Sequence, residues 1–190
     1  LVAWLVVSGL TATVGYVIAT RASNGVSVLG VVLGVSTFSG MLLGVRWVTD
    51  LGLGPALGHL SDRIGRHKIM VGVMSVFVFA YAILALTPPV AAIAFMFSLV
   101  FIGSSAFMIS LNAMVAESAR PEQRTVIIGR YTTWADIGSG TGPIIALPLL
   151  TNVGFGWTYG GASIVILLAA VVYSAVFTKR HGSSTRSRNV

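Results

Sequence analysis

The chain has 190 residues, a formal net charge of +7, and only 9% charged but 55% hydrophobic residues. Soluble domains carry about 25% charged residues, so this composition excludes a soluble globular domain and indicates a membrane protein. The complete absence of cysteine excludes disulfides, thiol catalysis and cysteine-bound metal.

Long uncharged runs predict six membrane-spanning helices, since a helix needs about 20 apolar residues to cross the hydrocarbon. The predicted helices cover residues 1–20, a second stretch that ends near Ser61, and residues 67–87, 90–115, 123–150 and 155–178. A second helix that started at Val26 would be longer than the bilayer is thick. It is therefore predicted to start later, near Gly34, or to bend at Pro55.

The basic residues fall on one side of this topology. Nine lie in the second-to-third loop, the fourth-to-fifth loop and the tail, against only Arg21 on the other side. The nine are Arg63, Arg66, Lys68, Arg120, Arg124, Lys179, Arg180, Arg186 and Arg188. Cations favour the cytoplasmic side, so these loops and both termini are predicted to be cytoplasmic. The net charge then requires no nucleic-acid partner.

The chain divides into a predicted six-helix transmembrane bundle over residues 1–178 and a basic, disordered cytoplasmic tail over residues 179–190. It opens on an apolar segment at Leu1, without methionine and without the charged flank of a signal peptide. We therefore expect it to be a piece of a longer polypeptide.

Three ionisable residues are predicted at membrane depth: Arg46 and Asp50 in the second helix and Asp136 in the fifth. Both aspartates lie about 18–19 Å from the cytoplasmic boundary, and charges so deep usually face a cavity or one another. One interpretation is a structural salt bridge between Arg46 and either aspartate. The other is that an aspartate takes up a proton or contacts substrate while Arg46 biases its protonation or binds an anion. Trp47 and Trp134, beside these charges, could form an aromatic cavity wall or serve packing.

A charged hairpin joins the second and third predicted helices. Its residues are Gly58, Asp62, Arg63, Gly65, Arg66 and Lys68. Asp62 and Arg66 have the spacing of an ion pair, and Gly65 permits a left-handed turn. Without a nucleophile and base, the hairpin is predicted to be a latch rather than a catalytic site. His59 and His67 have no third ligand at metal spacing, so no metal site is predicted.

The spacing G-x-x-x-D-R-x-G-R-x-K of this hairpin resembles the signature loop of the major facilitator superfamily of transporters. A second resemblance lies in the fifth helix, where Gly129, Gly138, Gly142 and Pro143 follow the glycine-proline motif of the antiporters of that superfamily. Ala146-Leu147 stand where that motif has paired glycines. Physically, glycines four apart let helix backbones approach closely, and a proline bends a helix.

The resemblance implies an all-α fold in which this bundle is one half of a twelve-helix transporter. Helices one, two, four and five of such a half line a central cavity. The absence of an arginine from the predicted fourth helix and the basic tail favour the carboxy-terminal half. The partners are then lipid, a small-molecule substrate and the other six-helix half.

The implied function is secondary active transport of a small solute by alternating access, with proton-coupled efflux as the first choice. The alternatives are an uptake symporter for a sugar or organic acid, and a non-transporting membrane sensor or partner subunit. No enzymatic activity, cofactor or metal is expected. The predicted location is the plasma membrane.

Overall fold

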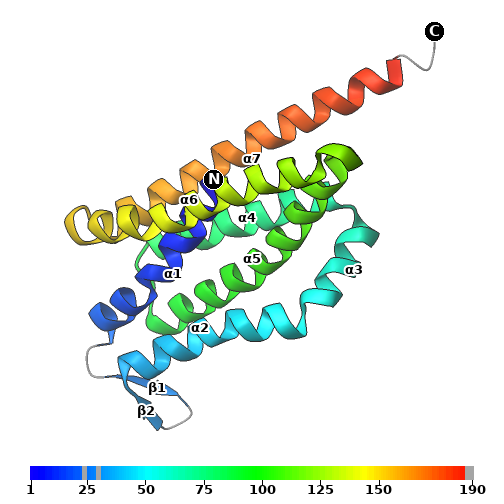
Figure 1. Ribbon diagram of the computed structural model, residues 1–190. Coiled ribbons are helices and arrows are strands. Elements are labelled where there is room, and N and C mark those ends of the chain that lie inside the picture. Colours follow the sequence, from blue (N-terminus) through cyan, green and yellow to red (C-terminus); the bar gives the residue numbers. More distant parts are fainter. Residues whose placement is uncertain (23–24, 29–30, 187–190) are drawn as a thin grey trace.

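The computed structural model describes residues 1–22, 25–28 and 31–186, and over these it is an almost entirely helical bundle (Figure 1). The helices are α1 (Val2–Arg21), α2 (Val35–Gly52), α3 (Gly54–Ile64), α4 (Arg66–Ala85), α5 (Val90–Ser118), α6 (Arg124–Asn152) and α7 (Phe155–Arg186). A short 3-10 turn, η1 (Pro121–Gln123), precedes α6. The predicted all-α membrane fold is thus confirmed.

Four helices are long and apolar enough to cross a membrane: α1, α4, α5 and the part of α7 from Phe155 to Phe177. The helices that carry the predicted buried charges, α2 and α6, are more polar. A count of six spans therefore stays a prediction.

The second predicted helix both starts late and breaks. It begins at Val35, directly after Gly34, and Leu53 separates α2 from α3. Pro55 lies in the first turn of α3, where a missing backbone N–H costs no helical hydrogen bond. The two-part helix thus resolves the length problem that the sequence posed.

Two short antiparallel strands precede α2 and were not predicted. They are β1 (Val26–Val28) and β2 (Val31–Leu33), with Val26 opposite Leu33. Gly25, with a φ of 91°, turns the chain into β1. The β-branched valines of this apolar run favour extended backbone, so length and hydropathy alone did not separate it from the helix that follows.

At the other end of the chain, α7 runs further than predicted. Its backbone stays helical to Arg186, beyond the expected end at residue 178. A helix of 32 residues is about 48 Å long, which exceeds the thickness of a bilayer. Residues 187–190 lie outside the described part, and the cytoplasmic location of the tail stays a prediction.

The core forms where α1 packs on α6, and where α4 packs between α5 and α7. Buried aromatic side chains fill it, among them Tyr81, Phe97 and Phe101. Hydrogen bonds also cross between helices: Thr13 Oγ1 and Tyr159 Oη lie 2.9 Å apart, and the Tyr81 hydroxyl donates to the carbonyl of Val6 at 3.0 Å. In lipid, such bonds and close packing hold helices together, because apolar side chains gain little by leaving the lipid.

The helices α1 and α6 approach each other closely at a seam of glycines. A Cβ placed on Gly142 would lie 2.5 Å from the carbonyl oxygen of Leu5 and 2.8 Å from the backbone nitrogen of Gly9. One placed on Gly138 would lie 2.7 Å from the carbonyl oxygen of Leu1. The Gly138/Gly142 pair therefore forms the close-packed seam that its spacing predicted.

Candidate functional site

Arg46 lies where four helices meet. Its half-buried side chain lines a cavity of about 330 Å³ between α1, α2 and α6. The other lining residues are Trp4, Val7, Ser8, Thr11, Ala12, Ser139 and Pro143. A smaller space beside Arg46 reaches α5 through Ser104 and Phe107. The four helices are the first, second, fourth and fifth predicted helices, the set that the resemblance noted in the sequence predicts to line a central cavity.

Arg46 does not form the ion pair that was one interpretation of the sequence. Within the described residues, no ion pair joins Arg46 to Asp50 or Asp136. Asp50 instead accepts a hydrogen bond from the hydroxyl of Ser105 on α5. Trp4 also lines the cavity, and its buried indole N–H lies beside the hydroxyl of Tyr131 on α6. The cavity therefore presents one cation, unpaired within the described chain, which suits an anionic group.

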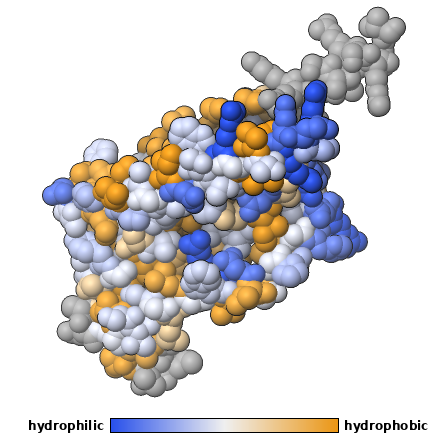
Figure 2. All heavy atoms as spheres, in the orientation of Figure 1, coloured by the Kyte–Doolittle hydropathy of each residue, from blue (hydrophilic) through white to orange (hydrophobic). Residues whose placement is uncertain are grey.

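The remaining predicted site residues lie on the surface of the bundle. Asp136 is exposed on α6, and Trp47 and Trp134 are 68% and 57% exposed. Hydrophilic residues in the middle of one face, beside α2, are visible in Figure 2. The structure thus brings Arg46 together with Ser139 and Pro143 of α6, but does not bring Asp136 to Arg46.

The charged hairpin forms a three-helix ion-pair cluster, which we call the latch: Asp62 on α3, Arg66 on α4 and Glu117 on α5. Arg66 donates to Asp62 Oδ1 from Nη2 at 2.7 Å and from Nε at 3.0 Å. Its other terminal nitrogen forms an ion pair with Glu117. Gly65, with a φ of 100°, makes the turn between α3 and α4. The predicted Asp62/Arg66 pair and left-handed Gly65 are both present.

The other hairpin cations surround the latch. Arg63 and Lys68 are exposed, and strongly hydrophilic residues gather at this end of the bundle in Figure 2. Gly58 lies on α3, where a Cβ would meet the side chain of Ile109 on α5 at 3.7 Å. The hairpin therefore combines an ordinary packing contact between α3 and α5 with a charged surface.

The glycine-proline motif in α6 divides into two parts. Gly138 and Gly142 contact α1, whereas a Cβ on Gly129 would meet nothing within 4 Å. Pro143 lies inside α6 and lines the cavity of Arg46. Because proline has no N–H, the carbonyl of Ser139 lacks its usual helical donor, so the motif places an extra acceptor group beside the cavity.

Several residues of the site were not predicted. Ser105, the partner of Asp50, and Ser8, Thr11 and Ser139 at the cavity come from otherwise apolar helices. The sequence pattern indicates such residues only weakly, because hydroxyl side chains in membrane helices commonly bond their own backbone, as Thr11 does to the carbonyl of Val7. The structure also identifies the partner of Glu117 on α5, which is Arg66.

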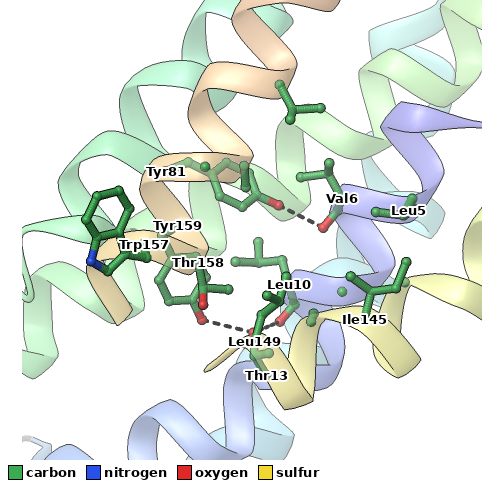
Figure 3. Close-up of a pocket in the computed structure, with 16 residues that line it drawn as sticks. Leu5, Val6, Leu10, Thr13, Tyr81, Ile145, Leu149, Trp157, Thr158 and Tyr159 are labelled. Carbon is green, nitrogen blue, oxygen red and sulfur yellow. Dashed lines mark hydrogen bonds between the residues drawn. The ribbon is translucent and has the colours of Figure 1, made fainter. Parts of the chain in front are cut away.

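A second cavity, of about 310 Å³, lies between α1, α6 and α7, with Tyr81 of α4 on its wall (Figure 3). Its lining is nearly all apolar and was not predicted. The lining residues include Leu5, Leu10, Thr13, Ile145, Leu149, Trp157, Tyr159, Gly161 and Val165.

The fold and these sites define a class: an integral membrane protein built as a helical bundle, with a charged group lining an open cavity and an ion-pair latch at one end. The chain belongs to the Major Facilitator Superfamily, whose family model matches residues 1–190. The members of this family are transporters.

Curated relatives are similar to the chain over part of their length. The chain is 25% identical over 155 residues to the multidrug resistance protein MdtG of Enterobacter lignolyticus (strain SCF1), covering 82% of the chain and 37% of that protein. It is 32% identical over 113 residues to the staphylopine export protein of Staphylococcus aureus (strain Mu50 / ATCC 700699), covering 57% and 28%. MdtG of Klebsiella pneumoniae (strain 342) is 24% identical over 151 residues, covering 80% and 36%. The chain thus spans about a third of the length of these relatives.

Proposed function

We propose that the chain is the carboxy-terminal six-helix half of a plasma-membrane transporter that exports a small solute in exchange for protons. One observation carries this proposal: Arg46, without an ion-pair partner in the described chain, faces a cavity walled by α1, α2 and α6 and close to α5. A charge at membrane depth is costly and marks a substrate or ion pathway. The names of two relatives, a multidrug resistance protein and a staphylopine export protein, support efflux as the direction.

In this proposal the six spans are α1, α2 with α3, α4, α5, α6 and α7. The absence of arginine from α5 supports the carboxy-terminal assignment. Arg46 contacts the solute, while Asp50 or Asp136 loads and releases the coupling proton. The exposed Trp47 and Trp134 belong to the face of the bundle that meets the other half. Rocking of the two halves about the shared cavity then exposes it to each side in turn.

The proposal is tested in inverted membrane vesicles that contain the full-length protein. A pH gradient is built up and followed with acridine orange while fluorescent organic cations and anions, among them ethidium and fluorescein, are added. Exchange for protons predicts that a transported dye collapses part of the gradient, and that Arg46→Gln removes this response. Dye movement in the same direction as the protons would support uptake symport instead.

The orientation of the bundle is tested with single cysteines at positions 68 and 152, which replace Lys68 and Asn152 in a full-length protein free of other cysteines. The positive-inside rule places position 68 in the cytoplasm and position 152 outside. An impermeant thiol reagent on intact cells should therefore label only position 152, and both positions after permeabilisation. Labelling of intact cells at position 68 but not at 152 would invert the topology.

The latch is tested by Asp62→Asn, which removes one of the two carboxylates bound to Arg66. Exposed ion pairs contribute up to about 1 kcal/mol, so the transport rate should fall about fivefold while membrane insertion stays normal. Glu117→Gln should have a similar effect. Glu122→Gln is the matched control, because Glu122 is exposed and has no ion pair in the described residues. Unchanged transport in the Asp62 variant at normal expression would argue against a latch.

A further inference from the structure

The apolar cavity between α1, α6 and α7 opens sideways. Four of its lining residues, Ile145, Leu149, Trp157 and Val165, are exposed, and Trp157 is 79% exposed. It opens there because α6 packs closely on α1 and only sparsely on α7. On α6 the lining runs from Gly142 to Leu149, about 10 Å along the helix. The cavity is therefore a lateral groove at the depth of the hydrocarbon, with α1 as its floor (Figure 3).

A cation lies beyond one end of this groove, about two helical turns past Thr13, the last lining residue of α1. Arg21, the last residue of α1, is exposed, and its guanidinium carbon lies 5.0 Å from the ring centre of Phe155. Phe155 lies 6.5 Å, ring to ring, from Tyr159, which lines the groove and forms a hydrogen bond with Thr13. Within the described residues, Arg21 has no carboxylate partner.

We propose that the groove binds an acyl chain of an anionic phospholipid whose headgroup phosphate lies on Arg21. The anionic headgroup of such a lipid is matched by Arg21, a cation at the end of α1 without a carboxylate partner in the described residues. The acyl chain is matched by the apolar groove, which begins about two helical turns before Arg21. Trp157, near the start of α7, has the position of an interfacial tryptophan, at the depth of the glycerol region. Since Arg21 lies at the end opposite the latch, the lipid belongs to the leaflet away from the latch.

The size of the groove decides between possible occupants. A helix with its side chains is about 10–12 Å across, so it could lie across a groove of about 310 Å³ but could not enter it. A lipid chain needs no such width, and lipid surrounds the protein on the side to which the groove opens. The guanidinium of Arg21 favours an anionic headgroup over a neutral one, because one Arg near a membrane surface strengthens the binding of anionic lipid about fivefold.

The test uses the full-length protein in nanodiscs that contain phosphatidylglycerol with a photoactivatable acyl chain. After irradiation and digestion, mass spectrometry locates and quantifies the labelled peptides. The label should appear on the groove-facing parts of α6 and α7, and more weakly when the same chain is carried by phosphatidylcholine. Arg21→Gln should lower phosphatidylglycerol labelling about fivefold. Arg21→Lys, which keeps the charge, should retain it.

Gly161→Leu tests the groove itself. Gly161 lines it, and a Cβ there would meet nothing within 4 Å, so leucine fits and fills the space. Labelling should fall to background in this variant. Gly140→Leu is the matched control, since Gly140 is equally open but does not line the groove. Size-exclusion profiles establish that each variant is folded.

Three results would overturn the proposal. One is equal labelling by phosphatidylglycerol and phosphatidylcholine together with no effect of Arg21→Gln. Another is undiminished labelling in folded Gly161→Leu. The third is full protection of the groove by a transported dye, which would make the groove a solute site rather than a lipid site.

Discussion

Gly142→Ala is expected to destabilise the bundle by about 3 kcal/mol, because overpacking of a closed interface typically costs 1–3 kcal/mol and here backbone must move. The new Cβ would lie 2.5 Å from the carbonyl oxygen of Leu5 and 2.8 Å from the backbone nitrogen of Gly9, and it would also clash with the hydroxyl of Ser8. Neither backbone atom can rotate away, so α1 and α6 must separate. The measurement is the thermal unfolding midpoint of the full-length protein in detergent.

Gly140→Ala is the control for this effect. Gly140 lies two residues earlier on the same helix, and a Cβ there would meet nothing within 4 Å. Alanine favours a helix over glycine by about 1 kcal/mol, so this variant should be neutral or slightly more stable. Adding Ser8→Ala to Gly142→Ala should recover only part of the loss, since the backbone clash remains. Equal midpoints for the Gly140 and Gly142 variants would contradict the close-packed seam.

Asp136→Asn is expected to remove transport driven by a pH gradient while exchange of solute survives. Asparagine can still line a solute pathway, but it cannot load and release a proton. Asp136 is exposed and has no hydrogen-bond partner within the described residues, so its replacement strands no other charge. Flux with and without the gradient, in the same reconstituted vesicles, separates coupling from solute binding.

Asp50 provides the comparison. Had it neutralised Arg46, Asp50→Asn would have stranded a buried cation at a cost of about 3–5 kcal/mol. Its bond is instead to Ser105, and an asparagine oxygen can accept that bond too, so this variant should fold normally. Full gradient-driven activity in Asp136→Asn, Asp50→Asn and Arg46→Gln/Asp50→Asn would refute a role for these charges in coupling.

Much of the fold followed from hydropathy and charge. Most helix ends, the break near Pro55 and the Asp62/Arg66 pair were predictable, because chain length, proline chemistry and side-chain spacing act locally. The strand pair β1/β2 was not, since its apolar residues satisfy the same hydropathy pattern as a helix. The extension of α7 beyond residue 178 was not predicted either, because the hydropathy pattern ends where the apolar residues end, whereas polar residues can continue a helix outside the membrane.

The site was harder to predict than the fold. The spacing of Arg46 and Asp50, one helical turn apart, allowed them to pair. In the structure the carboxylate of Asp50 instead accepts a hydrogen bond from Ser105 on α5, a helix far away in the sequence. Glycine spacing has the same limit. Gly40/Gly44 and Gly138/Gly142 have identical spacing, yet only the second pair meets another backbone. Which face of a helix meets a neighbour depends on tertiary packing, which no local pattern contains.

The break between α2 and α3 has a mechanical consequence. The backbone N–H groups of Leu53 and Leu57 bond the carbonyls of Thr49 and Leu53 at 2.9 and 2.8 Å, so the path continues from α2 into α3, but Pro55, in the first turn of α3, has no N–H to bond back to α2. A helix that lacks a backbone hydrogen bond at one point bends there more easily than elsewhere. Arg46 lies on α2, before this point, and Asp62 lies on α3, after it. A bend here lets α3 and the latch tilt while Arg46 keeps its place in the cavity.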